Sequence, residues 1–193
     1  MLDLGCGNGE LAAELEHGGH QGAYTGLDFS VELLKIARKR NYGNSKDVFH
    51  EADLTDAGWS EDLGEANFDR VLCFASLHHV PSQRLRERFL KQVRGLLSVG
   101  GSLVLSNWQF LNSPRLAARV QDWERAEIDE ADVDDGDYLL DWKRDGEGLR
   151  YVHHFDIEEL GQLAEASGFR VEETFASDGQ TGDLGLYQIW LAA

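Results

Sequence analysis

Apolar and polar positions along the first half of the chain follow two different spacing patterns. Short apolar runs bounded by Gly, Asp or Asn are typical of buried strands, and apolar residues spaced three and four apart are typical of helices. These patterns predict strands at 1–4, 23–27, 47–51, 68–74 and 101–107, and helices at 9–17, 30–40 and 83–97. Strands and helices that alternate in this way predict right-handed crossovers and a mostly parallel α/β sheet with helices on both faces.

The segment 83–97 carries the clearest helical pattern. Its apolar residues fall on one stripe, with Arg and Lys on the opposite face. The members of the stripe are Leu85, Phe89, Val93, Leu96 and Leu97. Ser82 is suited to cap the start of this helix, and the pair Gly100-Gly101 is expected to end the segment.

Residues 108–150 break the alternation and contain no clear strand. They hold Trp108, Trp123 and Trp142, and the run from Glu124 to Asp137 contains eight acids and one base. One interpretation is a solvated helix face and loop. The other is an acidic, Trp-containing insertion at about 108–150 that covers the active site.

Regular patterns resume at Asp156. Asp156 and Glu159 fit a capping box for a further helix, and Gly168 is expected to end that helix. Two more strands follow at 169–175 and 184–191. Joined by a tight turn, they are expected to complete a seven-stranded sheet with an antiparallel C-terminal strand.

Composition limits the partners that such a fold can serve. The 193 residues suit a single domain, 1–193, and 35 acidic against 18 basic side chains give a net charge of −17. This charge repels phosphate backbones and argues against a broad nucleic-acid-binding face, although a small basic patch remains compatible with it.

Cysteine content and hydropathy bear on the compartment. The two cysteines, Cys6 and Cys73, form no C-x-x-C pair, which favours a reducing, cytoplasmic environment. No run approaches the roughly 20 apolar residues of a membrane span, and no signal peptide precedes the first strand, so we expect no membrane association.

The first strand leads directly into three alternating glycines, Gly5, Gly7 and Gly9. Glycines let the backbone turn tightly and approach a ligand, and the helix that follows presents free N–H groups. Asp28 ends the second strand, where an acid holds a nucleotide ribose in folds of this type. A dinucleotide fingerprint would need glycine at Glu10, so an NAD or FAD site is a weaker alternative, as is an ordinary Gly-rich turn.

The next two strand ends add further candidates. Asp53 can accept from an adenine amino group, and Leu54 offers a backbone N–H and an apolar contact. The fourth strand ends in small residues followed by His78 and His79. Ligands of open α/β sheets bind beyond the carboxyl ends of the strands, so we expect the second substrate to lie here.

These segments together resemble the class I S-adenosylmethionine (SAM)-dependent methyltransferases, which have a Rossmann-like sheet. LDLGCGNG, TGLD, EADL, FDRVLCFASLHHV and LLSVGGSLVLSNW stand in the family's order over about residues 1–108. The resemblance implies SAM as cofactor, S-adenosylhomocysteine (SAH) as product, and a set of cofactor-binding residues. They are Asp3, Gly5, Gly7, Asn8, Asp28, Phe29, Asp53, Leu54 and Phe74.

Two consequences of this resemblance concern the start of the chain. An acid near the glycine loop, Asp3, suits the cationic amino group of SAM. The family usually has a helix or two before the first strand, whereas this sequence begins inside it. We therefore expect the N-terminal helix to be missing and the cofactor pocket to be partly open on that side.

The C-terminal half carries a narrower resemblance. GDYLLDW at 136–142, RYVHHF at 150–155 and DIEEL at 156–160 look like the eukaryotic-type tRNA wobble-uridine carboxymethyl methyltransferases. Those enzymes esterify the carboxylate of a modified uridine. Arg150, Lys143 and Arg144 are the only cations expected nearby.

Candidate catalytic residues follow from the methyl acceptor's chemistry. His79 and His154 are candidates to contact the acceptor and accept its proton, and Arg150 is a candidate to hold an anionic acceptor in a bidentate pair. A carboxylate acceptor needs no base. Adjacent histidines do not share a helix face and no ligand spacing completes a site, so no metal is expected.

The sequence thus predicts a SAM-dependent methyltransferase with a small or carboxylate-bearing acceptor, including a modified wobble uridine of tRNA. A small basic partner subunit would be needed for tRNA. The alternatives are a small-molecule O- or N-methyltransferase unrelated to RNA, and a regulatory module that binds SAM or SAH without turnover.

Overall fold

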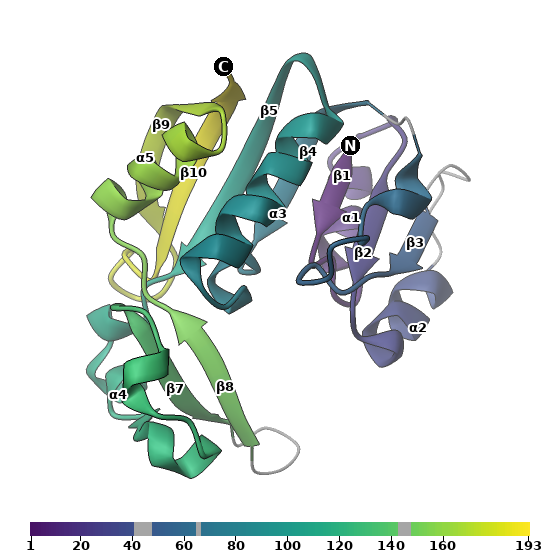
Figure 1. Ribbon diagram of the computed structural model, residues 1–193. Coiled ribbons are helices and arrows are strands. Elements are labelled where there is room, and N and C mark those ends of the chain that lie inside the picture. The colour runs from purple at the N-terminus through teal and green to yellow at the C-terminus, as the bar shows by residue number, and fades with distance from the viewer. Residues whose placement is uncertain (41–47, 65–66, 143–147) are drawn as a thin grey trace.

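A computed structural model of the protein describes residues 1–40, 48–64, 67–142 and 148–193. Its main feature is a seven-stranded sheet with the strand order β3-β2-β1-β4-β5-β10-β9 (Figure 1). The strands are β1 (Leu2–Leu4), β2 (Thr25–Asp28), β3 (Val48–Glu51), β4 (Phe68–Phe74), β5 (Leu97–Trp108), β9 (Phe169–Ser177) and β10 (Gly185–Ala192). The first five run parallel, and β10 pairs antiparallel with both β5 and β9, as the sequence predicts.

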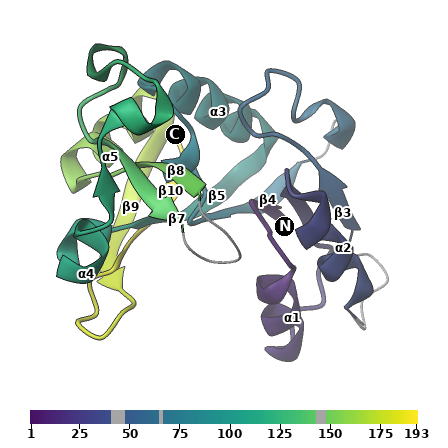
Figure 2. The same ribbon diagram turned by 90° about the horizontal axis from the view of Figure 1, so that it is seen from below.

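Helices cover both faces of this sheet (Figure 2). They are α1 (Glu10–His17), α2 (Val31–Lys39), α3 (Gln83–Leu96), α4 (Pro114–Ala117) and α5 (Ile157–Ala166). Short 3-10 turns η1 to η5 lie at Glu61–Leu63, Leu77–His79, Phe110–Asn112, Trp123–Ala126 and Glu130–Asp132. No helix in the described ranges is long and apolar enough to cross a bilayer.

Two apolar clusters hold the layers together. On one face, residues of α3 and α5 such as Phe89, Leu90 and Leu160 pack with Leu103 and Trp190 of the sheet. The cluster on the other face joins α1 and α2 to the sheet. Its members are Cys6, Ala12, Tyr24, Leu34, Ala37 and Phe49.

The predicted helix caps are present. Ser82 accepts a hydrogen bond from the backbone N–H of Leu85, and Asp156 accepts one from that of Glu159. The ends of two predicted elements are wrong, however. Gly100 and Gly101 lie inside β5, which begins directly after α3, because β5 extends past the sheet core on that side. A connection at 178–184, longer than a tight turn, separates β9 from β10.

The expectation of no strand in 108–150 is also wrong. This part of the chain forms a second sheet of β6 (Val120–Gln121), β7 (Asp137–Trp142) and β8 (Gly148–His153), in the order β6-β7-β8. Its own apolar cluster includes Phe110, Leu116, Leu140 and Val152. The small sheet lies beyond the carboxyl ends of the parallel strands, below β5 in Figure 1. The acidic run forms the connection from β6 to β7.

Candidate active site

The glycine loop lies between the ends of β1 and β4. Gly5 has φ +82°, and a Cβ added to it would lie 2.0 Å from Ser76 Oγ, so only glycine fits here. Gly7 has φ +55° and no atom within 4 Å of the position that a Cβ would occupy. The loop therefore packs against β4 on one side and leaves an open cradle on the other, as a bound cofactor requires.

Asp28 ties this loop to the second helix. The side chain is only 6% exposed; its Oδ2 accepts from the backbone N–H of Gly7, and its Oδ1 accepts from that of Ser30, both at 2.8 Å. Each carboxylate oxygen keeps a further lone pair, so the predicted bond to a ribose hydroxyl fits this geometry. The neighbouring Phe29 is 76% exposed and presents apolar surface beside it.

Asp3 lies deeper than its predicted contact with a cationic amino group suggests. It is 3% exposed, and its carboxylate accepts a hydrogen bond from the Tyr24 hydroxyl. Burial raises the pKa of Asp3 to about 6, although the bond from Tyr24 partly opposes this shift. Asp3 is thus buried beneath the start of the glycine loop and bonded to Tyr24, and its contact with the cofactor stays a prediction.

The remaining predicted cofactor residues lie along the same sheet edge. Asp28 pairs with Glu51 in the β2–β3 register, which brings the loop after β3 next to Asp28 at the end of β2. Asp53 there is exposed, and its Oδ1 accepts from the backbone N–H and hydroxyl of Thr55. Leu54 packs on the core, and Phe74 contacts the ring of Tyr187. Asn8, in the loop itself, accepts through its carbonyl from Arg40.

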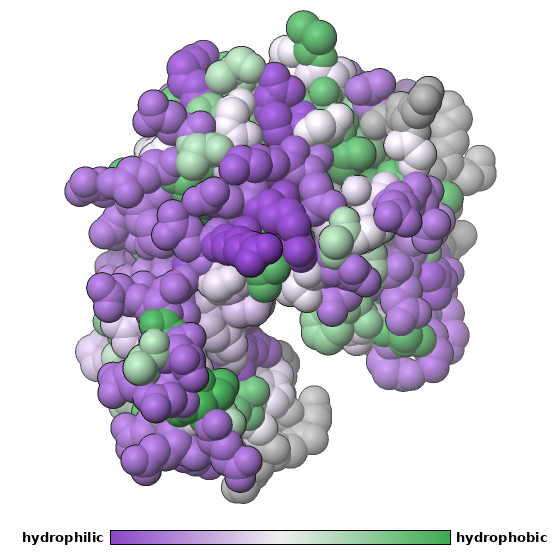
Figure 3. All heavy atoms as spheres, viewed as in Figure 1, coloured by the Kyte–Doolittle hydropathy of each residue, from purple (hydrophilic) through white to green (hydrophobic). Residues whose placement is uncertain are grey.

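A cavity of about 820 Å³ lies between the ends of β4 and β5 and the small sheet. Figure 3 shows the surface hollowed between the part that carries the small sheet and the part that carries α2. The lining residues are Ala75, His78, His79, Ser106, Asn107, Trp108, Arg115, Leu116, Arg119, Trp142, Arg150, Asp178, Leu184 and Gly185. We call this space the acceptor cavity.

Three arginines in the acceptor cavity contrast with the acidic molecule around it. Arg150 lies over the Trp142 ring, 3.9 Å from its centroid, and burial together with Arg119 lowers the pKa of Arg150. Arg119 pairs with Asp141 at 2.7 Å. The expectation that Arg150, Lys143 and Arg144 are the only nearby cations is therefore wrong, and the latter two lie outside the described residues. The i, i+4 spacing of Arg115 and Arg119 was the available signal.

The two adjacent histidines differ in role. His79 Nδ1 lies 2.9 Å from the backbone carbonyl of Tyr151, which only accepts, so Nδ1 carries the proton and Nε2 keeps a lone pair. Burial lowers the pKa of His79, and Arg150 adds to this effect. His78 is buried; its Nδ1 accepts from the backbone N–H of Trp108. His79 therefore lines the acceptor cavity as a neutral ring whose Nε2 can accept a proton.

His154 lies in a different place from His79 and Arg150. Its ring meets Phe110 edge-on at 5.4 Å, and it lines a separate cavity with Arg86, Asp134 and Glu159. The structure therefore does not bring His154 into the acceptor cavity. His154 directly follows the end of β8, and its backbone N–H donates to the Gly136 carbonyl at 2.8 Å, beside this second cavity.

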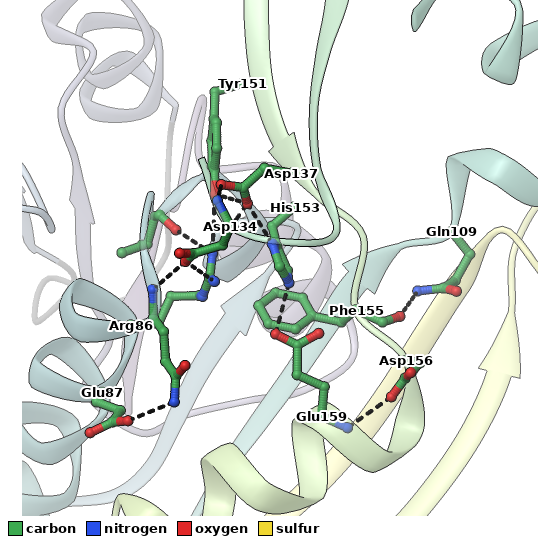
Figure 4. A network of polar contacts seen from close by, with 12 residues as sticks. Arg86, Glu87, Gln109, Asp134, Asp137, Tyr151, His153, Phe155, Asp156 and Glu159 are labelled. Atoms are coloured by element: carbon green, nitrogen blue, oxygen red, sulfur yellow. Dashed lines mark hydrogen bonds and ion pairs between the residues drawn. The ribbon is translucent and has the colours of Figure 1, made fainter. Parts of the chain in front are cut away.

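A buried polar network attaches the small sheet to the main fold (Figure 4). Arg86 of α3 is 1% exposed; it pairs with Asp134 at 3.0 Å and donates to the Tyr151 hydroxyl at 3.1 Å. Tyr151 donates in turn to Asp137 at 2.5 Å. The network links β7 and β8 to α3.

His153 extends this network to α5. Its two ring nitrogens lie 2.6 Å from Asp137 and 2.8 Å from Glu159. Burial alone would lower the pKa of His153, but the hydrogen bonds with the two carboxylates outweigh burial and raise it. The protonated ring then donates to both acids, which fixes β8 and with it the Tyr151 carbonyl that orients His79.

Comparison with known proteins identifies the fold's family. Residues 2–103 match the model of a methyltransferase domain family. The chain belongs to the SAM-dependent methyltransferases. This methyltransferase is 30% identical over 173 residues to a candidate methyltransferase of Encephalitozoon cuniculi, which covers 89% of the chain and 70% of that protein. SAM is accordingly its cofactor, and the contacts of the glycine loop, Asp28 and the neighbouring strand ends with it stay predictions.

A solved structure and a curated relative extend the comparison. A SAM-dependent methyltransferase from Methanosarcina mazei superposes with a TM-score of 0.72 at 25% identity, covering 98% of this chain and 90% of that one. The 27-O-demethylrifamycin SV methyltransferase of Amycolatopsis mediterranei is 32% identical over 117 residues, 59% of this chain and 40% of that protein. The methyltransferase thus spans less than half of the latter relative.

In the described ranges, His, Cys, Asp and Glu residues form no group of three or more that is arranged to hold a metal ion.

Proposed function

We propose that this enzyme methylates a small, carboxylate-bearing acceptor, with Arg150 binding the carboxylate and His79 accepting the proton of the group that is methylated. One observation carries the proposal: an acceptor cavity with three arginines and two histidines in a chain of net charge −17. Arg119 and Arg150 are close enough for their like charges to repel, and a bound anion would offset that repulsion.

Arg150 is the arginine best suited to bind the acceptor. Its guanidinium stacks on Trp142, and the described residues place no carboxylate in an ion pair with it. Arg119 is already paired with Asp141. A planar guanidinium presents two parallel N–H groups to a carboxylate, and stacking on an aromatic ring fixes its orientation. We therefore assign carboxylate binding to Arg150, with Arg115 and Arg119 adding positive potential.

His79 supplies the base. The cofactor provides an electrophilic methyl group, and a hydroxyl that attacks it must lose its proton. His79 is neutral because its pKa is lowered, and the Tyr151 carbonyl holds its Nδ1–H so that Nε2 is free to accept. The rifamycin relative is named for a 27-O-demethyl substrate, which supports a hydroxyl acceptor.

Labelled SAM tests the proposal. We expect label from the wild-type enzyme in the anionic fraction of a low-molecular-weight extract, and at least a tenfold loss with Arg150→Gln, since a charge-assisted pair contributes roughly 1.5–3 kcal/mol. Arg170→Gln is the matched control, because Arg170 lies on β9 in an exposed pair with Glu172. Label confined to neutral products, or equal losses in both variants, would contradict the proposal.

The same assay with total tRNA tests a second candidate acceptor, the modified wobble uridine. A modified wobble uridine also presents a carboxylate that Arg150 could bind. That carboxylate would itself be methylated, so this reaction would need no base from His79. Alkali-labile label in tRNA would identify a carboxymethyl ester there and would replace the small-molecule proposal. It would also require a search for the small basic partner subunit.

A further inference from the structure

Asn107 is the polar residue of the acceptor cavity that the function proposed above leaves unexplained. It lies near the end of β5 beside Trp108, lines the cavity, and is only 1% exposed. Apart from a contact with the His78 ring, neither its amide oxygen nor its amide nitrogen has a well-formed hydrogen bond to the described residues.

A buried amide that lacks well-formed hydrogen bonds is costly. Leaving such a donor or acceptor unsatisfied costs about 1–3 kcal/mol, and native proteins keep few groups of this kind. Nothing in the pairing of β5 demands an amide, because the backbone of Asn107 pairs with Leu186 of β10 in the regular register. The side chain therefore destabilises the free enzyme, and a ligand group would relieve that cost.

We propose that Asn107 determines acceptor specificity by binding a hydrogen-bond donor and acceptor that stand side by side on the acceptor, as in a lactam or carboxamide. This inference rests on the proposed function, since Arg150 would bind the carboxylate of the same molecule. An amide side chain offers one acceptor oxygen and a donor NH₂, which match the C=O and N–H edge of a cis amide. A site built in this way rejects analogues that lack the edge, because its own polar atoms then stay unpaired.

Two acids of similar size provide the test. Orotate carries a carboxylate and lactam edges on a six-membered ring, and benzoate carries the carboxylate without them. Calorimetric titrations in the presence of SAH are made with the wild type, Asn107→Leu and Arg150→Gln. We expect orotate to bind the wild type about tenfold more tightly than benzoate, and this preference to fall to within about twofold in Asn107→Leu. Arg150→Gln should weaken both acids.

Thermal unfolding without an acceptor provides a second, independent readout. Leu has nearly the shape of Asn but no polar atoms, so Asn107→Leu should unfold at the same or a higher temperature than the wild type. A structural amide would give the opposite result. SAH affinity should not change in this variant.

The outcomes separate the two proposals. Equal binding of both acids by the wild type, or a clearly lower unfolding temperature for Asn107→Leu, overturns the role of Asn107 and leaves the carboxylate proposal standing. Binding of neither acid by the wild type overturns both. Retained lactam preference in Asn107→Leu also excludes Asn107 as its source.

Discussion

At the scale of single residues, His79 shows how the fold sets the chemistry of a side chain. Its partner is a backbone carbonyl, which fixes the tautomer, and burial keeps the ring neutral. His78, adjacent in sequence, is buried with its Nδ1 bonded to the Trp108 backbone. The two rings are therefore not interchangeable, and we propose His79 alone as the base.

The pH dependence of turnover tests this role. The pKa of His79 is lowered from 6.5, so the ring is neutral at pH 7 and becomes protonated only as the pH falls below about 6.5. Activity should fall on that acid side. His79→Gln should lose turnover by roughly 100-fold or more and should lose the acid limb. His17→Gln, an exposed histidine at the end of α1, serves as the control. An unchanged acid limb in His79→Gln would assign it to another group.

At the scale of elements, Arg86 joins the small sheet to α3. The periodicity of α3 places Arg86 among its polar residues, yet the side chain is almost fully buried between Asp134, Asp137 and the Phe155 ring. A buried cation of this kind is maintained by its partners. The attachment matters for function because β8 carries Arg150 and the carbonyl that orients His79.

Arg86→Met tests the attachment. Removing one member of a buried charge network leaves the others uncompensated, so we expect a loss of about 3 kcal/mol in the free energy of unfolding. Limited proteolysis should cut the 108–153 part of the chain earlier than in the wild type. Arg84→Met is the matched control, because Arg84 is an exposed residue of the same helix. Equal stability of the two variants would show that the network contributes little.

At the scale of the whole molecule, charge is distributed unevenly. A net charge of −17 surrounds an acceptor cavity lined by three arginines. The field of the whole chain opposes long polyanions, whereas a small anion needs to satisfy only the local potential inside the cavity. We therefore expect the net charge of the whole chain to exclude long polyanions, and the arginines of the cavity to favour small anions.

This arrangement predicts how the enzyme behaves toward RNA. Binding of total tRNA by the chain alone should be undetectable by filter retention at micromolar protein, at both about 50 and 200 mM salt, since a net charge of −17 repels the phosphate backbone. Affinity that falls steeply between these salt concentrations would instead indicate a phosphate-binding surface, and would favour the tRNA acceptor.

The local sequence pattern predicts most of the main sheet, because the residues within each segment are enough to indicate whether it forms a strand or a helix. The glycine loop, Asp28 and the alternating elements need only short-range spacing, and the predicted antiparallel end of the sheet is confirmed. The local pattern does not reveal the second sheet, because polar residues interrupt β7 and β8 and acidic residues dominate the connection from β6 to β7. Their apolar residues, such as Leu140 and Val152, become a core only after Phe110 packs on them.

The sequence by itself determined the fold family and the strand ends at which we expect the cofactor, because these depend on motifs whose residues are neighbours along the chain. Only the tertiary structure decided the acceptor cavity. It separated His154 from His79, added Arg115 and Arg119 to Arg150, and buried the amide of Asn107 with no well-formed hydrogen bond to the described residues. The physical reason is that charge and hydrogen-bond satisfaction are properties of a space enclosed by distant segments, and no single segment specifies that space.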